Sequence, residues 1–298
     1  MKTLFKNVTL LFISLILCFP AMIYGQCKQG IVLENKSMKS KILGDSVKYS
    51  VFLPADYQKS TRSYPVLYLL HGYTDNEISW VQFGEVNRIA DNAIFKGEAA
   101  PMVIIMPDAG LSWYINNYTG KVKYEDMFFN EFIPFIEKAY RIRINKEFRA
   151  IGGLSMGGYG ALLYAMKHPD MFAACVPFSA GIHTNIETMK ILKENNNSFS
   201  YIDVYGPLKN DSLPETWYKN SILFLAATLP VEQLSSVRYY IDCGDKDFLI
   251  EGNCALHIVL KERKVPHEFR VREGDHTWVY WRESIYEGLK FVSQSFNR

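Results

Sequence analysis

The chain has 298 residues, of which 48% are hydrophobic and 21% are charged, so it can bury a large core. Its 33 basic and 31 acidic residues leave a net charge of +2, which provides no electrostatic basis for binding nucleic acid. The length exceeds that of an average domain, but α/β folds of this size commonly form one domain.

The N-terminus has the pattern of a secretory signal peptide. Lys2 and Lys6 precede an apolar stretch over 8–20, and small residues follow near Gly25. The apolar stretch is shorter than the roughly 20 residues that a membrane span requires. We therefore predict a signal peptide at 1–25 and an exported protein, periplasmic or secreted, without a stable membrane span.

The rest of the chain alternates between strand and helix patterns. Short apolar or alternating segments predict strands over 30–34, 47–53, 66–70, 102–106, 148–151, 171–178, 237–242 and 268–272. Helical periodicity covers 80–95, 124–140, 161–166, 252–263 and 281–296. This alternation predicts an α/β fold with a mostly parallel sheet and right-handed crossovers.

The segment 182–236 does not follow this alternation. It is polar around 195–197 and contains only a short apolar run over 222–227. We interpret it as a cap-like insertion within a single domain over 26–298, and not as a second domain. We expect this insertion to cover the ends of the strands and to select the substrate without supplying catalytic groups.

The sequence Gly153-Leu154-Ser155-Met156-Gly157 matches G-x-S-x-G between a predicted strand and a predicted helix. A serine there must occupy a sharp turn, and the two glycines keep Cβ atoms out of it. The helix N-terminus favours negative charge that develops at the hydroxyl. A tight structural turn or a phosphate cradle is the alternative, but GxxxxGK[ST] and GxGxxG are absent. Ser155 is therefore the predicted nucleophile.

Candidate partners for Ser155 follow the ends of later strands, where the working groups of an open α/β sheet lie. Asp245 and Asp247 come after the strand that ends at 242, and His276 comes after the strand that ends at 272. A serine hydroxyl needs an imidazole to accept its proton, and the imidazole needs a carboxylate to orient it. We predict His276 and Asp247 for these roles. Asp245 remains the alternative, because the geometry of the loop decides between the two.

Other predicted site residues surround this group. Two main-chain N–H groups should stabilise the oxyanion, those of Met156 and of Tyr73 in the loop after the strand over 66–70. Candidate substrate-binding side chains are Trp113, Tyr114 and Trp278, with core packing an equal alternative for the first two.

Among the cysteines, Cys175 lies in an apolar run, which predicts a buried free thiol. Cys243 and Cys254 could approach one another, but the sequence leaves their pairing open.

These motifs together resemble those of the esterase D-like α/β-hydrolases, a group that contains feruloyl, acetyl xylan and tributyrin esterases and mycolyltransferases. The matching segments cover most of 30–298 and are 68–72 with Trp80, 106–108 with 113–114, 153–158, Gly244 with Asp247, and 274–278 with Trp281. The resemblance implies a Ser-His-Asp ester hydrolase that needs no cofactor, and we expect no metal site. It also favours Asp247 over Asp245, and Tyr73 as an oxyanion donor.

The leading hypothesis is an exported carboxylesterase that acts on feruloyl or acetyl esters of carbohydrate. The branch of the resembling group that hydrolyses S-formylglutathione is cytoplasmic, so the predicted export counts against that activity. One alternative is an acyltransferase of the mycolyl type, in which a sugar hydroxyl replaces water. The other is a non-catalytic carbohydrate-binding protein on the same fold, against which the intact set of Ser155, Asp247 and His276 argues.

Overall fold

The structure is a computed structural model that describes residues 29–194 and 198–296. The predicted signal peptide at 1–25 lies outside the described residues. Within them, no helix combines the length and the apolar character needed to cross a membrane.

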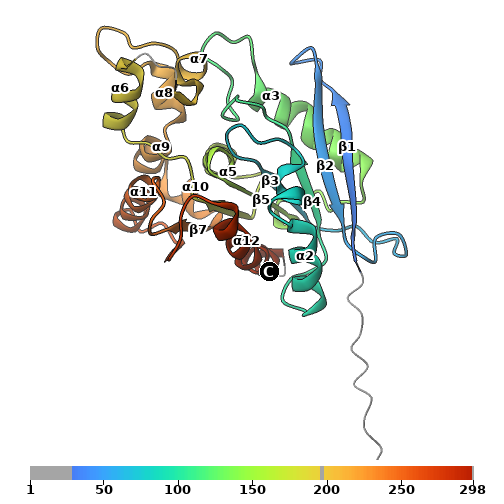
Figure 1. Ribbon diagram of the computed structural model, residues 1–298. Coiled ribbons are helices and arrows are strands. Elements are labelled where there is room, and N and C mark those ends of the chain that lie inside the picture. Colours follow the sequence, from blue (N-terminus) through green and yellow to red (C-terminus); the bar gives the residue numbers. More distant parts are fainter. Residues whose placement is uncertain (1–28, 195–197, 297–298) are drawn as a thin grey trace, which may run out of the picture.

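The centre of the molecule is an eight-stranded sheet with the order β1-β2-β4-β3-β5-β6-β7-β8 (Figure 1). Strands β1 and β2 pair antiparallel, as do β2 and β4, and every pair from β4 to β8 is parallel. The prediction of a mostly parallel sheet is confirmed. The strands are β1 (Ile31–Lys39), β2 (Ser46–Leu53), β3 (Val66–Leu70), β4 (Val103–Pro107), β5 (Arg149–Leu154), β6 (Ala174–Phe178), β7 (Arg238–Gly244) and β8 (Glu268–Arg272).

Helices connect these strands and cover both faces of the sheet. The helices are α1 (Ser79–Gln82), α2 (Val86–Phe95), α3 (Tyr124–Met127), α4 (Ile133–Ala139), α5 (Met156–Lys167), α6 (Asn185–Lys193), α7 (Tyr201–Tyr205), α8 (Glu215–Asn220), α9 (Ile222–Thr228), α10 (Val231–Ser235), α11 (Ile250–Glu262) and α12 (Trp278–Phe296). A π-helical segment, η1 (Phe128–Phe132), joins α3 to α4, so the helix predicted over 124–140 is continuous.

Two hydrophobic cores lie on the two faces of the sheet. Because successive side chains of a strand point to opposite faces, Tyr68 of β3 packs in one core and its neighbours Leu67 and Leu69 pack in the other. The first core includes side chains of α3, α5 and α11, and the second includes those of α2 and α12. Burial on both sides explains the continuous apolar runs of the central strands.

Several predicted elements differ from the structure: the strand predicted over 30–34 is longer (β1, Ile31–Lys39), as is the helix predicted over 161–166 (α5, Met156–Lys167). The helix predicted over 80–95 is broken into α1 and α2 at Gly84, where a Cβ atom would lie 2.6 Å from the Trp80 carbonyl oxygen and 2.8 Å from the Trp278 ring. This close packing, which the helical pattern does not reveal, ends the first helix. The strand predicted over 171–178 begins only at Ala174.

The insertion predicted over 182–236 has two parts with different surroundings. Its first part, through α7, packs near the ends of the strands, where Tyr201 contacts Trp113 with ring centroids 5.0 Å apart. Its second part contains α9, which packs against α5 and α11 in the helical layer beside the sheet. Only the first part therefore has the position expected of a cap.

The described cysteines, Cys175, Cys243 and Cys254, are free thiols, and the first two are buried. The pairing of Cys243 and Cys254 that the sequence left open is not formed in this structure.

Candidate active site

Ser155 occupies the sharp turn between β5 and α5. Its φ of 53° and ψ of −118° place it in a region that residues other than glycine rarely adopt. A Cβ atom on Gly153 would lie 2.6 Å from the Gly157 carbonyl oxygen, and one on Gly157 would lie 2.4 Å from the Leu70 carbonyl oxygen. The turn therefore accepts only glycine at both positions, which is the physical basis of the G-x-S-x-G spacing.

A hydrogen-bonded chain links Ser155 to two side chains from distant loops. The His276 Nε2 atom lies 3.0 Å from the Ser155 hydroxyl oxygen. The His276 Nδ1 atom lies 2.8 Å and 3.0 Å from the two carboxylate oxygens of Asp247. With a proton on Nδ1 that is donated to Asp247, Nε2 has a free lone pair directed at the serine hydroxyl.

The three aspartates near the end of β7 have different partners. Asp242 is buried and accepts hydrogen bonds from Arg272 at 2.9 Å and from Ser284 at 3.2 Å, so it braces β8 and α12. The Asp245 carboxylate accepts from the Gly274 N–H at 3.0 Å. Of these three, Asp247 is the one that contacts His276.

Asp247 is held in a fixed, nearly dry position. It is 1% exposed, and one carboxylate oxygen accepts from the Leu249 N–H at 2.9 Å. Burial by itself raises the pKa of the Asp247 carboxyl, but the contacts with His276 and the Leu249 N–H outweigh it and lower the pKa below its ordinary value. Asp247 is therefore a charged acceptor that fixes the ring orientation of His276.

His276 itself lies between two aromatic rings. The centroid of the Phe248 ring is 4.6 Å away, and that of the Trp281 ring is 4.8 Å away in an edge-to-face contact. Trp281 is buried, and its indole N–H donates to the Ser179 hydroxyl at 3.0 Å. Packing against these rings and the hydrogen bonds that Nδ1 donates to Asp247 together limit the motion of the imidazole.

The loop after β3 lies directly against Ser155. A Cβ atom on Gly72 would be 3.6 Å from the Ser155 Cβ atom. Met156 is the first residue of α5, so its N–H has no acceptor inside the helix. The N–H of Met156 and that of the next loop residue, Tyr73, are thus the two main-chain donors expected beside the serine.

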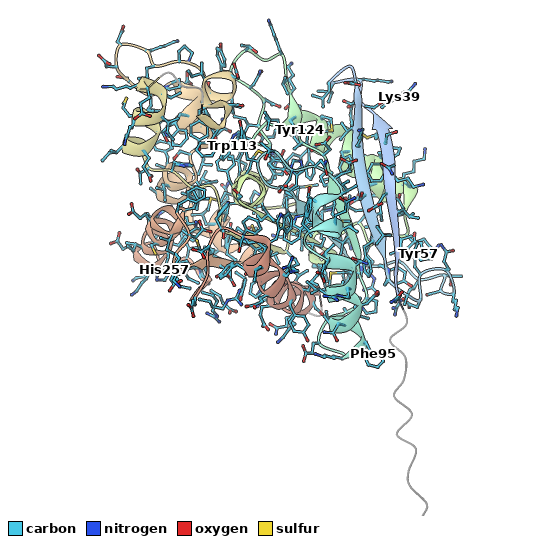
Figure 2. All side chains as sticks on the ribbon, in the orientation of Figure 1. Lys39, Tyr57, Phe95, Trp113, Tyr124 and His257 are labelled. Atoms are coloured by element: carbon cyan, nitrogen blue, oxygen red, sulfur yellow. The ribbon has the colours of Figure 1, made fainter. Side chains whose placement is uncertain are left out.

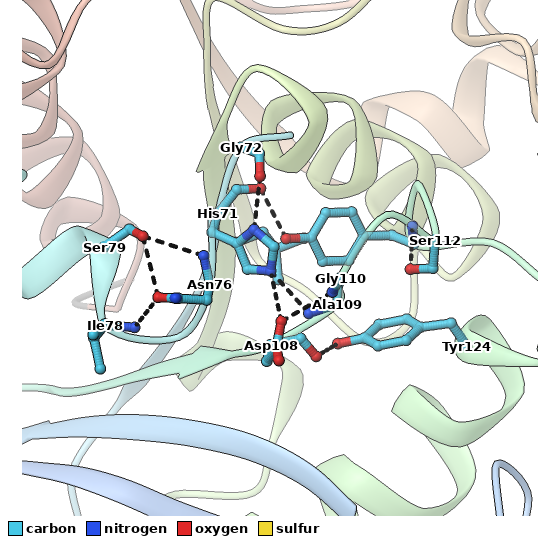
Figure 3. A network of polar contacts seen from close by, with 12 residues as sticks. His71, Gly72, Asn76, Ile78, Ser79, Asp108, Ala109, Gly110, Ser112 and Tyr124 are labelled. Atoms are coloured by element: carbon cyan, nitrogen blue, oxygen red, sulfur yellow. Dashed lines mark hydrogen bonds and ion pairs between the residues drawn. The ribbon is translucent and has the colours of Figure 1, made fainter. Parts of the chain in front are cut away.

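His71, in the same loop, is buried and is bound on both sides by the main chain (Figure 3). Its Nε2 atom accepts from the Ala109 N–H at 2.8 Å, and its Nδ1 atom lies 2.7 Å from the Gly72 carbonyl oxygen. Since Nε2 needs its lone pair for Ala109, the ring proton resides on Nδ1 and is donated to Gly72. The ring therefore ties the loop after β3 to the loop after β4.

Of the three side chains predicted to bind substrate, Tyr114 lies in the core. It is 0% exposed, its hydroxyl donates to the His71 carbonyl oxygen at 2.9 Å, and its ring packs against Gly160. Of the two interpretations that the sequence left open for Tyr114, core packing is the one the structure shows, because a side chain enclosed on all sides does not line a pocket. Trp113 is 2% exposed, so it supports the residues around the site and offers little surface of its own. Trp278 is partly exposed and packs on Trp80.

Phe199, which the sequence analysis did not single out, joins Tyr73 and Trp113 in an aromatic wall at one side of the site. The Trp113 indole N–H donates to the Phe199 carbonyl oxygen at 2.8 Å, and the Tyr73 hydroxyl lies 2.9 Å from the Ser200 hydroxyl. Trp113 also packs against Gly181, whose N–H donates to the Ser155 carbonyl oxygen at 2.9 Å. The first part of the insertion is thus bonded to the elements that hold the serine.

The sequence analysis also missed Phe248, which contacts His276. Its position directly after Asp247 was a signal that could have identified it.

In the part of the chain that the structure describes, no group of three or more His, Cys, Asp or Glu side chains could hold a metal ion.

Comparisons with known proteins identify the family of this chain. The model of the Esterase family matches residues 40–292. An acetyl esterase of Caldicellulosiruptor saccharolyticus is 26% identical over 262 residues, which cover 86% of this chain and 96% of that protein. An endo-1,4-beta-xylanase/feruloyl esterase of Xylanibacter ruminicola is 33% identical over 158 residues, 51% of this chain and 22% of that protein.

Solved structures give the same result for the fold. A ferulic acid esterase is 35% identical and superimposes with a TM-score of 0.77 over 90% of this chain and 99% of that chain. The predicted α/β-hydrolase fold is confirmed. The chain belongs to the Esterase family and is a serine carboxylic ester hydrolase with the α/β-hydrolase fold.

Proposed function

We propose that Ser155, His276 and Asp247 form the catalytic triad of an exported esterase that hydrolyses acetyl or feruloyl esters of carbohydrate. The observation that carries the proposal is the hydrogen-bonded chain from the Ser155 hydroxyl through both nitrogens of His276 to the Asp247 carboxylate. This is the arrangement that activates a serine for acyl transfer.

In the first step, the Ser155 oxygen attacks the ester carbonyl carbon while His276 Nε2 takes the serine proton. The charge that develops on the carbonyl oxygen is stabilised by the N–H groups of Met156 and Tyr73, which are preorganised at the start of α5 and in the loop after β3. When the tetrahedral intermediate collapses, the bond to the alcohol oxygen breaks and Nε2 returns the proton to that oxygen.

In the second step, water attacks the acyl group on Ser155. His276 takes a proton from the water, and the serine leaves with that proton, so the carboxylic acid is released and the enzyme is restored. Asp247 stays ionised throughout and stabilises the imidazolium, in agreement with its lowered pKa.

The substrate class rests on three kinds of support. Relatives named acetyl esterase and endo-1,4-beta-xylanase/feruloyl esterase act on short acyl or feruloyl esters, the second together with a xylan-degrading activity. The partly exposed rings of Tyr73 and Phe199, which the buried Trp113 supports, offer aromatic surface for a planar acyl group. The signal-peptide pattern at 1–25 supports export from the cytoplasm, which would bring the enzyme to polysaccharide.

The test compares wild type with Ser155→Ala on p-nitrophenyl acetate, methyl ferulate, and acetylated and feruloylated xylo-oligosaccharides. We expect turnover of both carbohydrate esters by wild type, and a loss of at least about 10³-fold in kcat for the variant. A fluorophosphonate probe should label Ser155 in wild type and fail to label the variant. Residual activity above a few per cent in the folded variant would overturn the assignment of the nucleophile. Net transfer of the acyl group to an added sugar, in preference to water, would favour an acyltransferase.

A further inference from the structure

We infer that Phe248 is a binding platform for the alcohol part of the substrate, and that the ligand stacked on it is a neutral sugar ring. The inference rests on the proposed function and specifies which surface of the site holds the carbohydrate. Phe248 is one of the more exposed large apolar side chains of the protein, with 62% of its surface accessible.

The loop presents this side chain rigidly. Phe248 lies between Asp247, which is 1% exposed, and Leu249, which is 4% exposed. The Leu249 N–H donates to the Asp247 carboxylate at 2.9 Å, and the Ile250 N–H donates to the Asp247 carbonyl oxygen at 3.0 Å. The main chain on both sides of the exposed ring is thus held by buried contacts, so a ligand that binds the ring loses little loop entropy.

The position of Phe248 relative to His276 determines which part of the ester it faces. The two ring centroids are 4.6 Å apart with an interplanar angle of 51°. In the proposed mechanism, His276 Nε2 returns its proton to the alcohol oxygen, which must then come within hydrogen-bonding distance of Nε2. The atoms attached to that oxygen consequently lie beside the imidazole and next to the Phe248 ring.

The acyl part is served by different elements. The aromatic wall made by Tyr73, Trp113 and Phe199 belongs to the loops after β3 and β4 and to the insertion, and Trp113 packs against Gly181 near the Ser155 main chain. Phe248 belongs to the loop after β7. The site therefore has separate apolar surfaces for the acyl and the alcohol groups.

The chemistry beside Phe248 suits an uncharged ligand. The nearest residue in sequence with a basic side chain, Lys246, is paired with Glu273 at 3.0 Å, so the pair presents little net charge. A sugar ring has a face of C–H bonds that packs on the negative face of an aromatic ring, while its hydroxyls remain in water. An exposed, rigid phenylalanine beside the proton donor fits such a ligand better than an anionic or cationic one.

The experiment measures kcat/KM on two pairs of esters that share an acyl group: methyl ferulate with feruloylated xylo-oligosaccharide, and p-nitrophenyl acetate with acetylated xylo-oligosaccharide. The variants are Phe248→Ala, Phe248→Leu and Phe248→Tyr. We expect the ratio of carbohydrate ester to small ester to fall roughly three- to ten-fold in the first two and to be retained in Phe248→Tyr. Phe248→Leu distinguishes two roles, because leucine can still shield His276 from water but cannot stack on a sugar ring.

Phe95 is a matched control, because it is an exposed phenylalanine (56%) at the end of α2, far from Trp113 in Figure 2. The Phe95→Ala variant should keep the wild-type ratio. Equal losses on both members of a pair, or no loss, would show that Phe248 only packs on His276 and would overturn the inference while the proposed function stands. A wild-type enzyme that hydrolyses neither carbohydrate ester would instead remove the proposed substrate class, and this inference with it.

Discussion

Within the described residues, two histidine–aspartate pairs lie at the carboxyl end of the sheet, and they differ in what the histidine faces. In one pair, His71 follows β3 and Asp108 follows the neighbouring β4, with His71 Nε2 and a carboxylate oxygen 3.4 Å apart. In the other, His276 follows β8 and Asp247 follows the neighbouring β7, with Nδ1 and a carboxylate oxygen 2.8 Å apart.

The two pairs differ in what the other ring nitrogen of the histidine contacts. In His71 both nitrogens are occupied by main-chain groups, those of Ala109 and Gly72, and the residue is 1% exposed. In His276 one nitrogen is oriented by a carboxylate and the other faces the Ser155 hydroxyl. A histidine–aspartate pair is thus not by itself a catalytic signal. The ring must also offer a lone pair to a reacting group.

Replacing the carboxylate of each pair should give the largest contrast. We expect Asp247→Asn to lower kcat by roughly 10⁴-fold, because an amide favours the wrong tautomer of His276. Asp108→Asn should lower it far less, since an amide oxygen can still accept from the Gly110 N–H that Asp108 binds at 2.9 Å.

The measurement is steady-state kinetics on p-nitrophenyl acetate, with folding checked by circular dichroism. Asp245→Asn is the matched control within the same turn, and it should keep most of the activity because Asp245 contacts Gly274 and not His276. A larger loss in Asp245→Asn or Asp108→Asn than in Asp247→Asn would contradict the assignment.

Replacing each histidine should separate stability from activity. His71→Ala leaves the Ala109 N–H and the Gly72 carbonyl without their buried partner, so we expect a loss of roughly 2–4 kcal/mol in the free energy of unfolding. His276→Ala removes the proposed base and should abolish fluorophosphonate labelling of Ser155 with a smaller change in stability.

The two readouts are the unfolding midpoint in urea and labelling by the probe at low temperature. The folded fraction of His71→Ala should still be labelled. A His71 variant with unchanged stability and no labelling would mean that His71 takes part in the reaction and does more than tie two loops together.

A smaller effect should appear in how the free energy of unfolding changes at acid pH. Because contacts with His276 and Leu249 lower the pKa of Asp247 below its ordinary value of 3.8, its ionised form stabilises the fold above that value. This contribution is lost as the pH falls through the lowered pKa. Between about pH 5 and pH 3, the free energy of unfolding should fall less steeply in Asp247→Asn than in wild type. Ser155→Ala, which keeps the aspartate–histidine pair, should show the wild-type slope in urea unfolding at each pH.

Much of the site is local in sequence and could be predicted. The G-x-S-x-G turn is one case, because the glycines that make room for the turn lie two residues before and after Ser155. The apolar runs of β3 and β4 predicted buried parallel strands, and working groups were expected just after strands. The positions of His276 and of the loop containing Tyr73 follow from the same rule.

Other features depended on contacts between segments that are distant along the chain. Asp245 and Asp247 are two residues apart, and the choice between them depends on how the loop after β7 meets the loop after β8, 29 residues further on. For Tyr114 the sequence left substrate binding and core packing open, and the hydrogen bond from its hydroxyl to the His71 carbonyl oxygen, 43 residues away, decides for the core.

The fold class, the turn at Ser155 and the strand ends at which its partners lie could thus be predicted from the sequence. Tertiary contacts were needed to separate Asp247 from its alternative Asp245, to place Tyr114 in the core, and to show that the first part of the insertion lies nearer the site than the second. The two sets of features differ in the sequence distance over which they are determined. Backbone turns and strand periodicity are governed by neighbouring residues, whereas hydrogen-bond partners and burial depend on loops brought together by the sheet.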